Sequence, residues 1–124
     1  MTAFATNGLA RAHHTWSTTT PAPGARQILL VNLMPTKEAT ELQFLRLLDA
    51  TGVNCDVTFA YPASHQLHHQ RAAVLKHYLP LDRLWGTRFD ALIVTGAPVE
   101  ELSFDQVDYW AEFQRLVAWS KTHC

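Results

Sequence analysis

Cysteine is scarce in this sequence, and its scarcity excludes two classes of small protein. The 124 residues contain only two cysteines, Cys55 and Cys124. Two cysteines are too few for the disulfide framework of a small secreted domain, and they lack the paired spacing of a zinc site. We therefore interpret both as free thiols.

A charge excess and long apolar runs are also missing. Ten Lys and Arg residues against eleven Asp and Glu residues give a formal net charge of -1. Such a balanced chain has no strong field to hold an anionic polymer, so nucleic acid is not an expected partner. No stretch approaches the roughly 20 apolar residues that span a bilayer, and residues 1–12 lack the pattern of a signal peptide. We expect a cytoplasmic protein without a membrane partner.

The chain has the length and apolar content of one ordinary globular domain. It is 48% hydrophobic and 17% charged, which is enough apolar mass to bury a core. Residues 1–26 show no sustained apolar period, and residues 17–23 are rich in Thr, Ala and Pro. We expect an extended N-terminal arm over residues 1–26, whose Trp16 is able to dock on a neighbouring surface, and a folded unit over residues 27–124.

Apolar periodicity predicts three strands and two long helices. A short run that is apolar on both faces indicates a buried parallel strand, whereas an alternating run indicates a strand nearer an edge. Thr36 is predicted to cap the first helix, with Glu38 and Glu41 in its first turn. In chain order we expect a buried strand at 28–31, a helix from 36 to about 52, an alternating strand at 53–59 nearer an edge, a polar crossover at 63–85 that is helical around 71–78, a buried strand at 89–94 and a helix at 105–121.

The order of these elements predicts a doubly wound α/β sheet. Strands that alternate with helices form parallel sheets whose helices cover both faces. In such sheets ligands collect at the carboxyl ends of the strands. Two loops meet this condition, residues 32–37 and residues 95–100.

The second of these loops begins with Thr95, Gly96, Ala97 and Pro98. Glycine after a buried strand lets the backbone turn sharply and present amide protons to a ligand oxygen, as in an oxyanion hole. A strand that ends in a glycine turn is also commonplace. By itself, therefore, the pattern favours a simple turn.

Four separated motifs follow the predicted elements in order. They are NLMPTK at 32–37, ELQFLRLL at 41–48, FDALIVTGAPVE at 89–100 and VDYWAEFQRLVAWSKTH at 107–123. Together they resemble the homoserine O-acyltransferase family of methionine biosynthesis, whose members use acetyl-CoA or succinyl-CoA. The resemblance covers residues 27–123 in order and in register.

The resemblance implies both a fold and a chemistry. The fold is a flavodoxin-like α/β sheet related to class I glutamine amidotransferases, incomplete in this chain, and residues 27–124 form its N-terminal part. The chemistry is transfer of an acyl group from acyl-CoA to the side-chain hydroxyl of L-homoserine. A cysteine thioester divides that transfer into two easier steps. Acetyl-CoA is then a co-substrate, and no cofactor is bound.

The catalytic side chains of the family have no counterpart among these residues. In the family the nucleophilic cysteine follows the next strand, and its histidine and glutamate lie much further on, so all three fall beyond Cys124. Cys124 itself matches a position before that strand, and Cys55 lies inside a predicted strand, so neither is assigned as the nucleophile. We expect the 124-residue chain to be an inactive fragment, because residual positioning cannot replace groups that act as a unit.

Three sites carry over from the resemblance. The amides of Gly96 and Ala97 match a loop that helps to stabilise the thioester oxyanion. Glu100 matches the position associated with donor choice, where glutamate accompanies acetyl-CoA and glycine accompanies succinyl-CoA; a carboxylate there repels the free carboxylate of a succinyl group. Lys37, in the first loop, is placed on the substrate side. For Glu100 and Lys37 the alternative is a solvated side chain near a helix start.

Other functions stay open. The acceptor is L-homoserine or L-serine, because one methylene changes binding by only about 1–3 kcal/mol, and the alternative donor is succinyl-CoA. A different class of function is a non-catalytic remnant of the enzyme. Such a remnant would lack the strand that pairs with residues 89–94, and the bare sheet edge predicts marginal stability or self-association, so a homodimer remains an alternative. A flavodoxin-like nucleotide or redox module is disfavoured, because residues 33–35 offer no phosphate cradle.

Histidines and aromatic residues suggest two further sites that we do not assign. His65 and His69 fall four apart in the histidine-rich crossover, but no acidic or cysteine ligand is spaced with them, so we expect no metal. Trp110 and Trp119 follow the apolar face of the last helix. For them core packing is favoured over a stacking platform.

Overall fold

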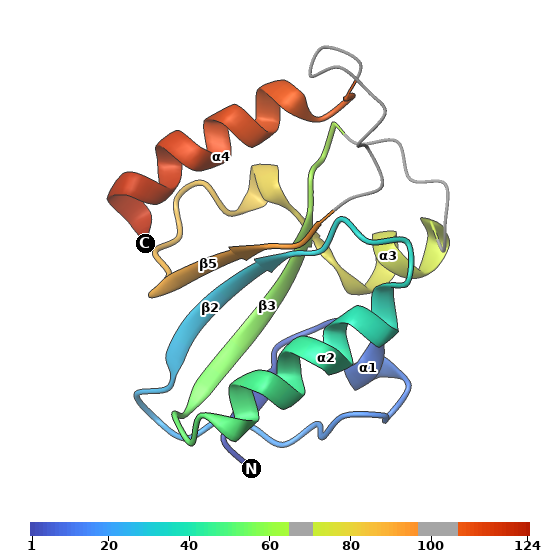
Figure 1. Ribbon diagram of the computed structural model, residues 1–124, viewed down its shortest axis with the longest axis vertical. Coiled ribbons are helices and arrows are strands. Elements are labelled where there is room, and N and C mark those ends of the chain that lie inside the picture. Colours follow the sequence, from blue (N-terminus) through green and yellow to red (C-terminus); the bar gives the residue numbers. More distant parts are fainter. Residues whose placement is uncertain (65–70, 97–106) are drawn as a thin grey trace.

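The computed structural model describes residues 1–64, 71–96 and 107–124 as one parallel sheet with helices on both faces (Figure 1). In chain order the elements are β1 (Ala3–Ala5), α1 (Leu9–Ala12), β2 (Arg26–Val31), α2 (Lys37–Ala50), β3 (Cys55–Tyr61), α3 (Arg71–His77), β4 (Leu79–Pro80), the 3-10 turn η1 (Leu81–Arg83), β5 (Ala91–Val94) and α4 (Trp110–His123). Among these described helices, none has the length and apolar content that crossing a membrane requires.

Every strand pairing in the described sheet is parallel. The order is β1-β3-β2-β5, and β4 lies beside the end of β3. In the middle of the sheet, Leu30 of β2 pairs with Phe59 of β3 on one side and with Ile93 of β5 on the other. Parallel neighbours need a crossover, and α2 provides the one from β2 to β3. The predicted α/β fold with a parallel sheet is therefore confirmed.

The side chains of β2 alternate between two apolar cores. Ile28 and Leu30 join the core under α1 and α2, which also contains Leu45. Leu29 and Val31 join the opposite core, which α4 covers (Figure 1). Full burial of a side chain of this size contributes about 1.5–3 kcal/mol. The continuous apolar run of β2 thus supplies both faces, which explains why the sheet carries helices on both sides.

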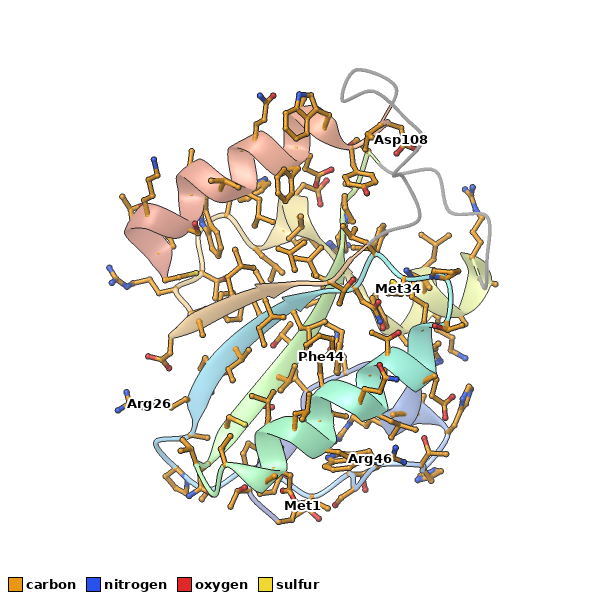
Figure 2. The ribbon with its side chains drawn as sticks, in the orientation of Figure 1. Met1, Arg26, Met34, Phe44, Arg46 and Asp108 are labelled. Carbon is orange, nitrogen blue, oxygen red and sulfur yellow. The ribbon has the colours of Figure 1, made fainter. Side chains whose placement is uncertain are left out.

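Helix α2 forms where the sequence predicted it. It begins at Lys37, after Thr36 as the N-cap residue, and ends at Ala50. Two residues later the chain turns at Gly52, whose φ of 74° favours glycine. The Thr36 side chain makes no capping hydrogen bond, so the start of the helix is fixed by other contacts. Phe44 lies between α2 and the sheet and packs against the core there (Figure 2).

Strand β3 is second from the edge of the sheet, beside the three-residue β1, but the more solvated face predicted for it is wrong because its residues are mostly buried. Over residues 55–57 it pairs with β1 on one side and β2 on the other. The alternation that suggested an edge has another cause, because Asp56 accepts a 2.7 Å hydrogen bond from the Thr6 hydroxyl and Thr58 is itself buried. The polar residues of this strand therefore do not mark a solvated face.

The strand that covers β3 comes from the predicted arm. In residues 1–26 the structure has β1 and α1, both packed into the core, in place of a freely extended segment. Trp16 docks as expected: its Nε1 donates a 3.0 Å hydrogen bond to the Ala3 carbonyl. The Asp49 carboxylate accepts hydrogen bonds from the backbone N–H groups of Thr2 and Ala3, which fixes β1 against the end of α2. The proposed division of the chain at residue 26 stays a prediction.

The later elements agree with prediction in type and differ at their starts. Strand β5 begins at Ala91 rather than at 89, because the Phe89 N–H bonds to the His123 carbonyl at the end of α4. Phe89 is nevertheless buried in the core under α4. Helix α4 is described from Trp110, and residues 105 and 106 of the predicted helix lie outside the described ones.

Candidate functional site

The two loops that follow β2 and β5 are joined at the carboxyl edge of the sheet. The Leu33 N–H donates a 2.8 Å hydrogen bond to the Thr95 hydroxyl oxygen. That hydroxyl in turn donates to the Gly96 carbonyl over 3.0 Å, and the Thr95 N–H bonds to the Val31 carbonyl. Both loops begin at the carboxyl edge of the sheet, as predicted, and Thr95 joins their first residues.

Lys37 is a buried cation beside this junction. Lys37 is only 4% exposed, and its Nζ donates a 2.8 Å hydrogen bond to the Asn32 carbonyl. Burial lowers the pKa of Lys37 to about 8, although the Glu41 carboxylate acts in the opposite direction. The ammonium therefore stays mostly charged at neutral pH. A solvated lysine at the start of α2, which was the alternative, does not describe this residue.

Asn32 connects the first loop to α3 through a buried hydrogen-bond network. Its side-chain Nδ2 donates to the Tyr78 hydroxyl over 3.0 Å and to the Lys37 carbonyl over 3.2 Å. The Asn32 Oδ1 accepts a hydrogen bond from the Met34 N–H, so both polar atoms of the Asn32 side chain are hydrogen-bonded. Asn32 is fully buried. A fully satisfied buried network of this kind rigidifies the backbone that it holds.

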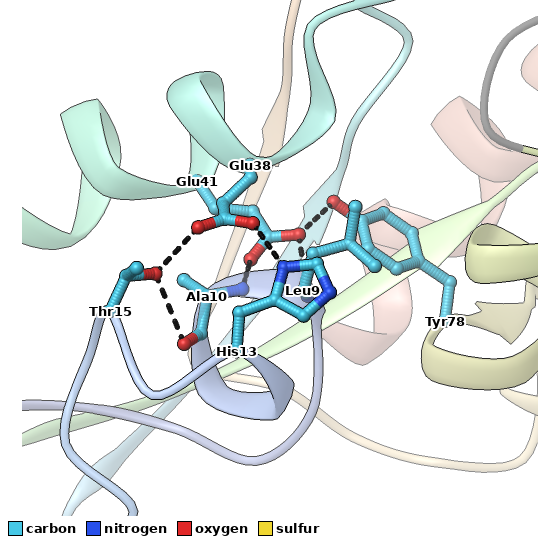
Figure 3. Close-up of polar contacts among 7 residues, drawn as sticks. All are labelled: Leu9, Ala10, His13, Thr15, Glu38, Glu41 and Tyr78. Carbon is cyan, nitrogen blue, oxygen red and sulfur yellow. Dashed lines mark hydrogen bonds and ion pairs between the residues drawn. The ribbon is translucent and has the colours of Figure 1, made fainter.

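Glu41 is the far end of the same network. It is fully buried, and its carboxylate accepts hydrogen bonds from the N–H groups of Leu9 (3.0 Å) and Ala10 (2.8 Å) and from the Tyr78 hydroxyl (2.5 Å) (Figure 3). Burial raises the pKa of Glu41, and these three hydrogen bonds oppose the rise. The same burial, together with Glu41, raises the pKa of Tyr78, so the phenol remains a donor.

Sequence reasoning missed this role of Glu41. It was expected to act as a first-turn acid that favours the helix dipole, yet in the structure it ties α2 to α1 and α3. A signal was present in the sequence, because Glu41 lies four residues before the fully buried Leu45 and so shares its helix face. No comparable signal marks Tyr78, whose partners are 37 and 46 residues away in the chain.

Glu38, three residues before Glu41, has the opposite environment. It is partly exposed, accepts a 2.7 Å hydrogen bond from the Thr15 hydroxyl, and lies 2.5 Å from His13 Nδ1 (Figure 3). These two hydrogen bonds, that of Thr15 first, lower the pKa of Glu38. The two acids of the first helical turn therefore both hold the segment around α1, one from inside and one from the surface.

The sites carried over to the second loop are only partly described. Ala97 and Glu100 lie outside the described residues. At Gly96 the φ angle is outside the left-handed region, and an added Cβ would meet no described atom within 4 Å. Neither its conformation nor the described atoms around it demands a glycine there. The oxyanion role of Gly96 and Ala97 and the donor role of Glu100 stay predictions.

The two thiols differ in access. Cys55 is 2% exposed within β3, and burial raises its pKa. Cys124 is exposed at the end of α4, and its pKa is also raised by partial desolvation. Neither thiol has the lowered pKa of a nucleophilic cysteine.

We expect a thiol reagent such as Ellman's reagent to label one cysteine of the native chain and two of the unfolded chain. Cys124 should react at once because it is exposed, whereas Cys55 should react only when β3 opens. Cys124→Ser should abolish the native reaction, and Cys55→Ser should leave it unchanged. Rapid labelling of two thiols in native buffer would contradict the packing of β1 against β3.

Core packing was predicted for Trp110 and Trp119, and the structure places Trp119 in the core under α4, whereas Trp110 is half-buried and outside both cores. The Trp119 ring meets Trp85 and Phe89 edge-on, with ring centroids 5.8 and 6.2 Å away, and its Nε1 donates to the Trp85 carbonyl. Trp110 stacks on Phe113 at the other end of the helix. Within the described part of the chain, no three His, Cys, Asp or Glu side chains come together as metal ligands, and residues 65–70 of the histidine-rich crossover lie outside it.

The family model and the individual relatives that match this chain indicate the same family of proteins. A family model described as homoserine O-succinyltransferase matches residues 13–124. A protein of Leuconostoc mesenteroides named homoserine O-acetyltransferase is 50% identical over 96 residues, which are 77% of this chain and 32% of that protein. A protein of the same name from Streptococcus thermophilus is 47% identical over 98 residues, which are 78% of this chain and 31% of that protein. Another, from Streptococcus sanguinis, is 50% identical over 97 residues, which are 77% of this chain and 31% of that protein.

The chain spans about a third of the length of these relatives. The family model, in contrast, covers nearly all of the chain, including the sheet from β2 onward and α4. The motifs that pointed to homoserine O-acyltransferases are thus supported independently of the fold. The chain belongs to the homoserine O-succinyltransferase family.

Proposed function

We propose that this chain is part of an acyl-CoA-dependent O-acyltransferase that transfers acetyl from acetyl-CoA to the hydroxyl of L-homoserine through a cysteine thioester. The observation that carries the proposal is family membership, together with the relatives named homoserine O-acetyltransferase. In this proposal the nucleophilic cysteine and its histidine and glutamate lie on polypeptide beyond Cys124. The residues of this chain then bind and position the substrates.

The junction of the two carboxyl-edge loops is suited to that task. The Thr95 hydroxyl holds the Gly96 carbonyl and joins the end of β5 to the loop after β2. In the proposal, the amides of Gly96 and Ala97 stabilise the oxyanion that forms when a thioester is attacked. In the proposal, the buried Lys37 ammonium, which is bonded to the Asn32 carbonyl of the neighbouring loop, attracts an anionic group of a substrate through its charge.

Glu100 is proposed to select the acyl donor. A glutamate carboxylate near the acyl group repels the free carboxylate of succinyl-CoA and leaves the neutral acetyl group unaffected. Selection of this kind comes from rejection of the wrong donor, so its loss should broaden the donor range rather than weaken acetyl transfer.

The test uses the longer protein that contains this chain, assayed with acetyl-CoA and succinyl-CoA against L-homoserine and L-serine. We expect acetyl-CoA with L-homoserine to give the highest kcat/KM. Glu100→Gly should raise kcat/KM for succinyl-CoA about tenfold or more, which corresponds to about 1.4 kcal/mol of repulsion removed. The neighbouring acid offers a matched control, and Glu101→Gly should leave the donor preference unchanged.

Three outcomes would contradict parts of this proposal separately. Equal rates with both donors in the unmodified protein would defeat the role of Glu100. Faster transfer to L-serine would replace the acceptor. Transfer by the 124-residue chain alone, retained after both Cys55 and Cys124 are replaced by serine, would defeat the cysteine thioester mechanism.

A further inference from the structure

A hollow of about 360 Å³ opens at the outer edge of the sheet, away from the junction of the two loops. Its walls come from the turn between β1 and α1, from α1 and the loop after it, and from the last turn of α3. The volume falls within the range of about 300–1,000 Å³ that is usual for small-molecule sites. The lining residues are Thr6, Asn7, Gly8, Arg11, Ala12, His14, Thr18, Lys76 and His77.

The charge of the lining has one sign. The lining contains the basic side chains of Arg11 and Lys76 and the imidazoles of His14 and His77. No carboxylate is among the lining residues, although the whole chain has a formal net charge of -1. Cationic side chains are thus concentrated here without the acidic partners that usually accompany them on a surface. A hollow of this composition favours an anion.

The walls are fixed to one another by hydrogen bonds. The Gly8 N–H donates to the His77 carbonyl over 3.0 Å, which joins the turn after β1 to the end of α3. Arg11 Nη1 donates to the carbonyls of Ala5 and Thr18, each over 3.2 Å, so the guanidinium is held in place. A guanidinium has five N–H donors, and the bonds through Nη1 leave others free to bind a ligand. The site is therefore built before any ligand arrives.

The acids nearest to the hollow have partners of their own. Beneath Gly8 lies the Glu41 carboxyl group, whose oxygens accept from Leu9, Ala10 and Tyr78, away from the opening. Beside Thr6 lies Asp56, which accepts the Thr6 hydroxyl. Among the described residues, neither acid forms an ion pair with a cation of the lining. The surface acid Glu38, which contacts His13 beside the lining residue His14, likewise forms no ion pair with Arg11 or Lys76 in the described part of the chain.

We propose that this hollow binds a phosphate-bearing small molecule of about the size of a nucleotide. A held guanidinium together with an ammonium is the combination that binds phosphate oxygens best, one by paired donors and the other as a point charge. The hydroxyl groups of Thr6 and Thr18 border the same space and suit the sugar or further oxygens, whereas the Asn7 amide is bonded to the backbone of Phe59. The phosphate belongs either to a free nucleotide or to the phosphorylated adenosine end of an acyl-CoA, and only the second source rests on the proposed function.

Isothermal titration calorimetry of the 124-residue chain tests the proposal with three probes: inorganic phosphate, adenosine 3′,5′-bisphosphate and coenzyme A. We expect saturable binding of the bisphosphate, tighter than that of inorganic phosphate. Lys76→Gln should weaken bisphosphate binding about tenfold, the effect expected of one hydrogen bond to a charged group. Lys121→Gln, which removes a cation from α4, is the matched control and should change nothing.

The relative affinity of the probes identifies the source of the phosphate. Coenzyme A binding at least tenfold tighter than the bisphosphate would support the donor, and equal affinities would support a free nucleotide. The proposal is overturned if no probe binds with a Kd tighter than about 1 mM, which is only about −4 kcal/mol. It is also overturned if Lys76→Gln and Lys121→Gln bind the bisphosphate equally well. None of these readouts requires acyl transfer, so failure of the proposed function would leave the result interpretable.

Discussion

Gly8→Ala should destabilise the fold by about 2–4 kcal/mol, enough to lower the melting temperature by roughly 10 °C. The glycine has φ 102° and ψ 173°, a conformation that only glycine adopts readily. An added Cβ would also lie 2.8 Å from Glu41 Oε1 and 2.8 Å from the Phe59 ring. Neither neighbour is free to retreat, because Glu41 is held by three hydrogen bonds and Phe59 is fully buried. Thermal and urea unfolding followed by circular dichroism measure the loss.

Two other glycines separate the contact from the backbone conformation. Gly24 and Gly52 also have positive φ angles, 82° and 74°, but an added Cβ at either position meets no described atom within 4 Å. Gly24→Ala and Gly52→Ala should therefore cost only the backbone strain, about 1 kcal/mol each. A loss at Gly8 no larger than at these two positions would show that the close approach of α1 to Glu41 and Phe59 is not tight.

The main architecture could be predicted because each of its main elements has an apolar pattern within one continuous segment of the sequence. The apolar run of β2, the apolar face of α2 and the buried face of α4 each lie within one continuous segment, and each was predicted at nearly its true position. The tendency of ligands to collect at the carboxyl ends of parallel strands then singled out the loops that begin at Asn32 and Thr95 as candidate ligand sites. Thr95 itself was not singled out, because a hydroxyl that bridges two loops leaves no periodic mark.

The N-terminal segment was mispredicted because its signals are short. Strand β1 has three residues and α1 has four, below the length at which a period of two or 3.6 can be recognised. Their stability comes from contacts with distant residues, such as Asp49 bound to Thr2 and Glu41 bound to Leu9. The solvated face predicted for β3 has the same cause, because the neighbouring strand β1 was missed.

Glu41→Ala should be among the most destabilising substitutions in this chain, at about 3–5 kcal/mol. It leaves the N–H groups of Leu9 and Ala10 and the hydroxyl of Tyr78 without their acceptor in a buried site. It also leaves a cavity between α1 and α2. Since a domain of this size is stable by only about 5–15 kcal/mol, urea unfolding should show a large shift of the midpoint. A loss below about 1 kcal/mol would mean that water replaces the carboxylate, and hence that the network is open to solvent.

Glu41→Gln, by contrast, should show its effect in how stability depends on pH. The raised pKa of Glu41 means that the folded state holds this proton to a higher pH than the unfolded state does, where the pKa is about 4.5. The stability contributed by this group is therefore full below about pH 4.5 and is lost as the pH rises through the folded-state pKa. Glu38 has a lowered pKa, so its contribution is full above about pH 4.5 and is lost as the pH falls.

The two neighbouring glutamates thus predict opposite changes in one experiment, the free energy of unfolding in urea measured from about pH 3 to pH 8. Glu41→Gln should flatten the decline toward neutral pH, because the variant has no carboxyl group to ionise inside the core. Glu38→Gln should flatten the decline toward acid and leave the other arm intact, since its contacts with Thr15 and His13 lie at the surface. Identical pH profiles for the two variants would show that Glu41 is ionised in the fold as easily as Glu38, and would remove the buried carboxyl group from the account of how α1 is held.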